Sequence, residues 1–247
     1  MLGMASIIVV VAAFFAAFID TSLGLCYGTI LTPFLLLAGY QPELAVPAVL
    51  LSQLVVDVGG SVMHTKVKNF TSKDVKSAVL VTIPATLFVP LGAFLNVTLP
   101  VNITKAYIGI LVTVLGILIV AGIRVKKTSD RIIFMSGIAG LNKGMVGGGF
   151  GPVVVSGQIA LNSNIRPAIA IKHIAEVPVC IVGLLTFALF ENLTFSPIFL
   201  IVCLPALIAA VIGPYMTIKV SQKRYAERMI GMITFLLGFA TILKLIY

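Results

Sequence analysis

The residues of this sequence most able to do chemistry are charged side chains inside or between apolar stretches. Lys143 lies in the Gly-rich stretch 140–152, and Asp20 lies in a polar break between two apolar stretches. A cation together with the free N–H groups of a helix N-terminus replaces the hydration of a small anion. Lys143 and the glycines at 147–149 therefore predict an anion site.

Lys143 also has a structural interpretation. It aligns with Asp20 in the internal repeat described below, so a buried ion pair between the two is the alternative to substrate binding. Both interpretations hold if the substrate displaces Asp20. The glycines likewise allow two backbones to approach closely, whether or not they contact a ligand.

Glu176 and His173 predict a second function, ion coupling. Glu176 follows Arg166 by ten residues, about 15 Å along a helix, which places its carboxyl group near the middle of a bilayer. His173 adds a side chain of a type that can titrate near neutral pH, which favours proton coupling. The alternative is an ion pair of Glu176 with Lys172, one helical turn earlier.

Gln53 and Asp57 are further candidates for substrate binding and for ion coupling. Gln53 aligns with Glu176 in the repeat and offers an amide to an anion, whereas Asp57 is either a coupling residue or a wetted helix end. Ser22 either caps a half-helix or contacts substrate, and His64 is expected in a solvated loop. The predicted substrate-binding residues are Lys143, Asn142, Gly147, Gly148, Gly149, Asp20, Ser22, Gly24 and Gln53, and the predicted coupling residues are Glu176, His173 and Asp57.

The composition determines which elements position these residues. Of 247 residues, 60% are hydrophobic and 10% charged, against about 25% charged in soluble domains. The apolar stretches are near-continuous, which excludes the alternation of a membrane barrel. We therefore expect an all-α polytopic membrane protein.

Ten apolar segments form two related halves. Shifting the sequence by 123 positions aligns Asp20 with Lys143 and Gln53 with Glu176, which predicts repeats at residues 1–123 and 124–247. The first two segments of each half are short or broken helices that either cross fully or form re-entrant hairpins. The segments are 2–19, 24–38, 43–62, 77–95, 105–123, 131–141, 146–161, 166–190, 195–217 and 228–246.

Basic residues predict the orientation of the halves. Three runs lie around Lys68, Lys126 and Arg224. The repeat equivalents of the first and third runs, around Glu191 and at Asn96–Thr104, lack Lys and Arg, so the bias reverses between halves. Five segments per half put all three runs in the cytoplasm and both termini outside. The halves are then inverted repeats.

The whole chain resembles the TauE/SafE family of sulfite exporters, also called the toluene-sulfonate uptake permease family. The resemblance rests on the size, the duplication and the Gly-rich stretch Gly140–Pro152; Asp20–Gly28 matches more weakly, with Leu25 and Cys26 where the second half has glycines. It implies transport of a small sulfur-containing anion such as sulfite, a sulfonate or sulfoacetate, driven by a proton or sodium gradient.

The expected partners are that anion, H⁺ or Na⁺ as the coupling ion, and cell-membrane lipid. The net charge of +9 reflects basic runs between apolar segments, not a nucleic-acid interface. Cys26, Cys180 and Cys203 lack metal-ligand spacing, and no cofactor is expected. The alternatives to a transporter are an anion channel, and an intramembrane enzyme or accessory subunit, although the sequence lacks the usual catalytic motifs.

Overall fold

The computed structural model describes residues 4–25, 27–122, 129–160, 165–190, 196–220 and 224–246, which form helices and turns without a strand. The fold class expected from the sequence, an all-α polytopic membrane protein, is confirmed. The helices are α1 (Met4–Leu23), α2 (Tyr27–Leu37), α3 (Pro42–Lys66), the 3₁₀ helix η1 (Ser72–Asp74), α4 (Val75–Thr98), α5 (Val101–Ala121), α6 (Ser129–Val146), α7 (Phe150–Ala160), α8 (Ile165–Phe190), α9 (Pro197–Val220) and α10 (Arg224–Ile246).

Local residue preferences explain several helix ends. Pro42 occupies the first turn of α3, where its missing N–H costs nothing. Gly122 follows α5 with φ 64°, a left-handed conformation that glycine adopts without strain and that ends the helix. The ten helices correspond to the ten segments expected from the sequence.

Six helical segments within the described residues are long and apolar enough to cross a membrane. They belong to α3, α4, α5, α8, α9 and α10. By contrast, α2 and α7 have 11 residues each. At 1.5 Å per residue each is about 16 Å long, half of a hydrocarbon core.

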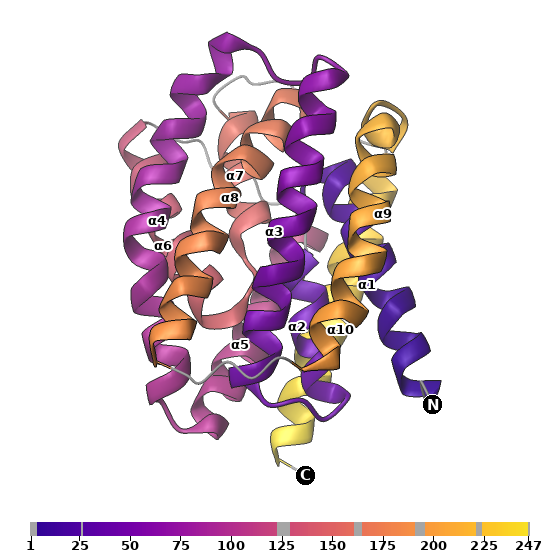
Figure 1. The fold of residues 1–247 in the computed structure, drawn as a ribbon, viewed down its shortest axis with the longest axis vertical. Coiled ribbons are helices and arrows are strands. Elements are labelled where there is room, and N and C mark those ends of the chain that lie inside the picture. The colour runs from indigo at the N-terminus through magenta and orange to yellow at the C-terminus, as the bar shows by residue number, and fades with distance from the viewer. Residues whose placement is uncertain are drawn as a thin grey trace.

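The helices pack in a pattern that repeats between the halves. α1 packs on α9 as α6 packs on α4, and α3 packs on α9 as α8 packs on α4. α3 and α8 pack on each other, as do α5 and α10. The N- and C-terminal ends lie at the same end of the molecule (Figure 1).

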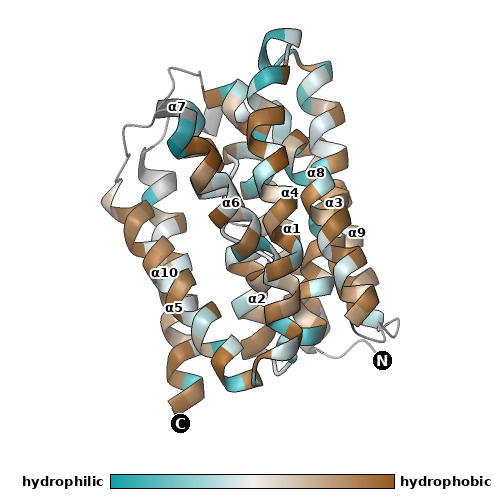
Figure 2. Cartoon of the chain, turned by 90° about the vertical axis from the view of Figure 1, so that its left-hand side faces the viewer, coloured by the Kyte–Doolittle hydropathy of each residue, from teal (hydrophilic) through white to brown (hydrophobic). Residues whose placement is uncertain are grey.

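Apolar side chains cover the outside of the helix bundle. Leu87, Phe134 and Leu189 are each at least 70% exposed, which a membrane protein tolerates because lipid contacts them. Hydrophobic residues run along most of the length of the helices (Figure 2). The polar side chains discussed below are instead buried between helices.

Some of the sequence predictions fall outside the described residues. These are Lys126, Glu191 and Cys26, of which the first two contributed to the predicted sidedness. Cys180 and Cys203 are free thiols, Cys180 being fully buried.

Candidate functional site

Two matching breaks, after α1 and after α6, position the central residues. Gly24 follows α1 with φ 71°, and its N–H donates to the carbonyl of Asp20 at 2.6 Å. Gly147 follows α6 with φ 73°, and its N–H donates to the carbonyl of Lys143 at 2.8 Å. The two charged residues therefore occupy the same place, in the last turn before a left-handed glycine.

The breaks contact each other through glycines. A Cβ on Gly28 would overlap the carbonyl oxygen of Gly147, and one on Gly148 would lie 2.5 Å from the backbone nitrogen of Thr29. A Cβ on Gly151 would lie 2.5 Å from the carbonyl oxygen of Gly24. Only glycine permits this approach. These glycines therefore have a structural role, which is to let two backbones approach closely.

Side chains from other helices satisfy backbone carbonyls at the breaks. Asn96 donates its amide to the carbonyl of Met145 at 2.7 Å. His64 Nε2 lies 3.1 Å from the carbonyl oxygen of Thr21, and the Thr217 hydroxyl lies 3.4 Å from it. Such partners stabilise irregular backbone that is buried inside a membrane protein.

Lys143, Lys172, Asp20 and Glu176 form a buried charge cluster between the two breaks. Lys143 Nζ lies 2.6 Å from Glu176 Oε1. Lys172 Nζ lies 2.6 Å from Glu176 Oε2 and 2.6 Å from Asp20 Oδ2. All four side chains are at most 2% exposed, so each charge depends on its partners for stabilisation.

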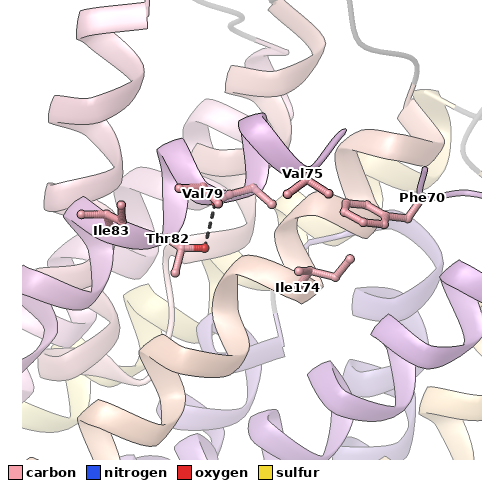
Figure 3. Close-up of a pocket in the computed structure, with 7 residues that line it drawn as sticks. Phe70, Val75, Val79, Thr82, Ile83 and Ile174 are labelled. Atoms are coloured by element: carbon pink, nitrogen blue, oxygen red, sulfur yellow. Dashed lines mark hydrogen bonds between the residues drawn. The ribbon is translucent and has the colours of Figure 1, made fainter. Parts of the chain in front are cut away.

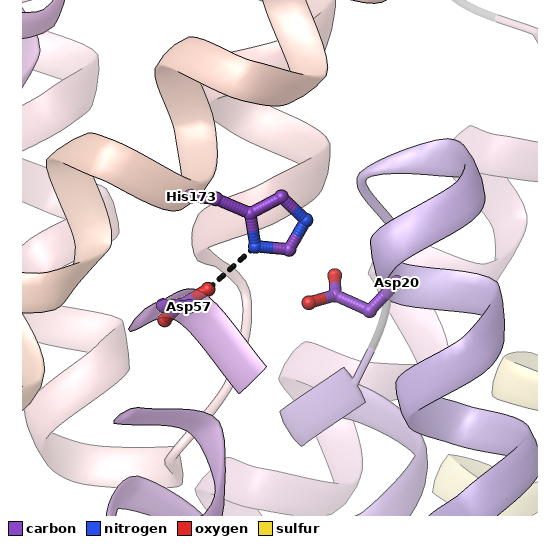
Figure 4. Close-up of side chains that lie close together, drawn as sticks. All are labelled: Asp20, Asp57 and His173. Atoms are coloured by element: carbon purple, nitrogen blue, oxygen red, sulfur yellow. Dashed lines mark hydrogen bonds and ion pairs between the residues drawn. The ribbon is translucent and has the colours of Figure 1, made fainter. Parts of the chain in front are cut away.

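Gln53, Asp57 and His173 extend this cluster along α3 and α8. Gln53 Nε2 donates to Asp20 Oδ2 and to Asp57 Oδ1, both at 2.9 Å. His173 Nδ1 lies 2.7 Å from Asp57 Oδ1, and Figure 4 shows the imidazole facing both aspartates. Lys172 Nζ also lies 3.3 Å from Asp57. One hydrogen-bonded network therefore links α1, α3 and α8.

Lys172 contacts two members of a group of side chains that could hold a metal ion. Asp20, Asp57 and His173 bring ligand atoms within 4.8 Å of one another. The ammonium group of Lys172 already contacts both aspartates. The cation that the protein itself supplies therefore balances these carboxylates.

A small cavity opens between the breaks. Its volume is about 10 Å³, the size of one water molecule. The first turns of α2 and α7 both contribute to its wall, together with the charge cluster. The lining residues are Asp20, Tyr27, Gly28, Thr29, Gln53, Lys143, Gly148, Gly149, Phe150, Gly151, Pro152, Lys172 and Glu176.

A larger cavity of about 270 Å³ lies between α4 and α8 and is apolar (Figure 3). Phe70, Val79 and Ile174 contribute to its wall. The hydroxyl of Thr82 donates to the carbonyl of Ala78 in its own helix and offers no free donor. This cavity therefore lacks groups that would recognise an ion.

The structure brings together most of the residues predicted from the sequence. Lys143, Asp20, Gln53, Gly148, Gly149 and Glu176 line the small cavity, and Asp57 and His173 bond to the cluster behind it. Ser22, Gly24, Asn142 and Gly147 do not line it. Ser22 donates to the carbonyl of Gly213 on α9, and Asn142 accepts a hydrogen bond from the hydroxyl of Tyr107.

Four details differ from the predictions. Lys143 pairs with Glu176 rather than with Asp20, whose cation is Lys172. The N–H of Gly147 is not free for a ligand, because it closes α6 on the carbonyl of Lys143. Asp57 is not a wetted helix end and His64 is not in a solvated loop, since both side chains are 0% exposed.

Sequence reasoning understated Lys172 and missed Tyr27 and Thr29. Lys172 was expected only as a neighbour of Glu176, but it contacts three carboxylates. The internal repeat contains a signal for Tyr27 and Thr29, because they align with Phe150 and Pro152 in the Gly-rich stretch. Their hydropathy alone gave no reason to select them.

The sequence profile of the family described as "Sulfite exporter TauE/SafE" matches residues 9–241. The chain belongs to this family. Members are membrane transporters, which agrees with the expectation of a transport protein rather than an enzyme. The match extends across nearly all of the ten α-helices described. It therefore includes both breaks and the charge cluster.

The chain is also similar in sequence to a curated protein, the "Probable membrane transporter protein YtnM" of Bacillus subtilis (strain 168). The two are 32% identical over 146 residues, which cover 55% of this chain and 48% of the relative. The match thus spans about half the length of that relative. No solved structure matches the chain.

Proposed function

We propose that this TauE/SafE chain is a secondary transporter of a small sulfur-containing anion of the sulfite, sulfonate or sulfoacetate type. The supporting observation is that the first turns of α2 and α7 and the ammonium groups of Lys143 and Lys172 line one cavity. Helix N-termini carry partial positive charge, so four positive features surround the place where an anion would sit. The substrate class itself comes from the family.

The carboxylates give the reason for ion coupling. Two lysines face three carboxylates, those of Asp20, Asp57 and Glu176. With all five ionised and the histidines neutral, the cluster carries one net negative charge before an anion arrives. A proton or a sodium ion entering with the anion removes this repulsion, because opposite charges stabilise one another strongly at low dielectric. Glu176, His173 and Asp57 are the proposed coupling residues.

Substrate binding requires the ion pairs to separate. A cavity of about 10 Å³ admits no oxyanion while Lys143 contacts Glu176 at 2.6 Å. We propose that the bound anion replaces the Glu176 carboxylate as the partner of Lys143 and lies beside Gly148 and Gly149. Protonation of Glu176 frees the lysine for the anion, which links coupling to binding.

The halves 1–123 and 124–247 are proposed as inverted repeats that rock against each other around this site. The repeated helix packing supports a twofold relation between them, and the location of both termini at one end fits an even total of crossings. The basic residues favour the opposite end as cytoplasmic and both termini as external. Alternating access then needs no large cavity in the closed state.

Counterflow in proteoliposomes tests this proposal. Vesicles are loaded with unlabelled sulfite, sulfoacetate or a small sulfonate and diluted into a trace of the labelled compound. A carrier accumulates label transiently above equilibrium, whereas an anion channel, the second candidate, only equilibrates it. Absence of flux for all three compounds would contradict the substrate class.

A further inference from the structure

His64 connects the central cluster to the end of α3. It lies seven residues after Asp57, about 10 Å along the helix, and two residues before the helix ends at Lys66. Its ring stacks on that of His173, with centroids 5.4 Å apart and planes at 22°. Gly60 allows this packing, since a Cβ there would lie 3.3 Å from the His173 ring.

The hydrogen bonds of His64 define its protonation. Asn69 donates its Nδ2 amide to His64 Nδ1 at 3.0 Å, so Nδ1 is an acceptor. His64 Nε2 therefore carries the hydrogen and donates to the carbonyl of Thr21 at 3.1 Å. Asn69 is 5% exposed and lies in the turn after α3, so it separates His64 from the end of the bundle.

His173 has the complementary arrangement. Its Nδ1–H donates to the carboxylate of Asp57 at 2.7 Å. Its Nε2 is buried and has no hydrogen-bond partner among the described residues. A bare imidazole nitrogen inside a membrane protein is a proton acceptor whose lone pair is otherwise unused.

We propose that Asn69, His64 and His173 form a proton path between the end of α3 and Asp57 in the charge cluster. This inference rests on the proposed proton-coupled transport and names the route. Asn69 turns its amide, and His64 Nδ1 takes a proton from water. The N–H bonds of an imidazole lie in the ring plane, so the protonated His64 ring must first turn out of the stack and release the Thr21 carbonyl. Its Nε2–H bond then breaks while a new N–H bond forms at His173 Nε2. His173 Nδ1–H in turn passes its proton to Asp57 Oδ1, so one net proton moves and both rings end neutral, with the remaining hydrogen on His64 Nδ1 and on His173 Nε2.

The charged groups around the two rings are consistent with transfer toward the cluster. Asp57 and Asp20 attract a proton inward, whereas Lys172 and Lys143 oppose its accumulation on the rings. α4 and α7, which also pack on α8, contribute only Lys76, exposed at the end of α4. The buried titratable or charged groups on α3, on α8 and on the helices that pack against them are Asp20 on α1, Tyr27 on α2, Asp57 on α3, Lys143 on α6, and Lys172, Glu176 and Cys180 on α8. α9, which packs on α3, adds the partly buried Cys203 and the exposed Tyr215.

His64→Gln is the test variant. A glutamine amide can donate to Thr21 and accept from Asn69, so it keeps the structure without carrying a proton. Thr65→Val is the matched control, because the Thr65 hydroxyl is exposed and donates to Ser61 within its own helix. We expect His64→Gln to keep sulfoacetate counterflow at equal pH close to wild type. Net uptake driven by a pH gradient should fall about tenfold or more.

Unchanged pH-driven uptake in His64→Gln would overturn the path, as would wild-type uptake driven by sodium alone. Equal loss of counterflow and uptake would show that His64 is structural. A wild-type protein that moves no sulfoacetate would contradict the proposed function instead. The path is then judged without substrate, by NMR of the exchange of the His173 Nδ1 proton with water in nanodiscs. Exchange should slow about tenfold in His64→Gln and not in Thr65→Val; equal rates would overturn the path.

Discussion

At the residue scale, the chemistry of this protein depends on how a few buried charges share partners. Lys172 contacts Asp20, Asp57 and Glu176, whereas Lys143 contacts Glu176. Glu176 is thus the residue common to both lysines. A change in its charge affects both lysines of the cluster, so Glu176 is the residue through which we propose that proton binding controls anion binding.

Glu176→Gln should make anion binding independent of pH. Each proton that enters the cluster cancels one negative charge, so wild-type affinity for an anion falls as the pH rises. Glutamine has nearly the shape of protonated glutamate, and the variant should bind at high pH as the wild type does at low pH. Sulfoacetate is a suitable probe because its charge is constant across neutral pH, and calorimetry at several pH values gives the profile.

Asp57→Asn is the comparison for this experiment. Asp57 does not line the cavity, so its replacement should leave the pH dependence of binding in place. If Glu176→Gln keeps the full wild-type profile, the proton that controls binding resides on another group.

The sequence identified these charges but not their pairing. Lys143 and Asp20 align in the repeat, which suggested a pair, yet each bonds to α8 instead. The partner that a side chain contacts depends on how helices from the two halves are rotated against each other. The spacing of residues in the sequence does not reveal this rotation. The exposure of His64 was misjudged for a similar reason, because its ring packs on His173 of α8 while its neighbours Thr65 and Lys66 are exposed.

At the element scale, the two broken helix pairs are held by close contact of their backbones. The first turns of α2 and α7 approach the opposite break so closely that only glycine fits at Gly28 and Gly148. Hydropathy and Gly-rich breaks were enough to predict ten segments and both breaks. The contact between the breaks could not be predicted, because it joins residues about 120 positions apart in the sequence.

Gly28→Ala should destabilise the protein strongly. The added methyl group would overlap the carbonyl oxygen of Gly147, and two backbones must separate to admit it. Overpacking of this kind costs about 1–3 kcal/mol or more, which a thermal melt in detergent would detect.

Gly137→Ala provides the control for Gly28→Ala. Its Cβ would lie 3.2 Å from the ring of Phe88, a half-exposed side chain that can move aside. The control should melt near wild type. A Gly28→Ala protein with an unchanged melting temperature would show that the breaks are not in tight contact.

At the scale of the whole molecule, the packing of α1 and α3 on α9 corresponds to the packing of α6 and α8 on α4. Gly60 on α3 contacts His173 on α8, and its repeat mate Gly183 contacts Leu50, the mate of His173. The same contact thus occurs twice, once with a polar and once with an apolar side chain. The two halves have diverged at this position, because His173 on α8 corresponds to Leu50 on α3.

Cysteine labelling tests the sidedness that the basic residues predict. The test uses a protein whose native cysteines are replaced. Lys68 lies just before the segment Ser72–Thr98 and Thr98 lies at its far end, so Lys68→Cys and Thr98→Cys report on opposite sides. Lys68→Cys should react with an impermeant thiol reagent only from the cytoplasm, and Thr98→Cys only from outside. Arg224→Cys, at the start of α10, should react from the cytoplasm; labelling it from outside would contradict inverted repeats.

The central claim is that Lys143 binds the transported anion, and sulfoacetate affinity in a double variant tests it most directly. Lys143→Met removes the charge but leaves Glu176 buried without this partner. A lower affinity of the single variant could therefore come from lost binding or from reduced stability. Lys143→Met combined with Glu176→Gln removes both charges and should melt near wild type. A charge-assisted contact contributes about 1.5–3 kcal/mol, so the double variant should bind sulfoacetate roughly ten- to a hundredfold more weakly. A stable double variant with wild-type affinity would show that Lys143 only neutralises Glu176 and would contradict the claim.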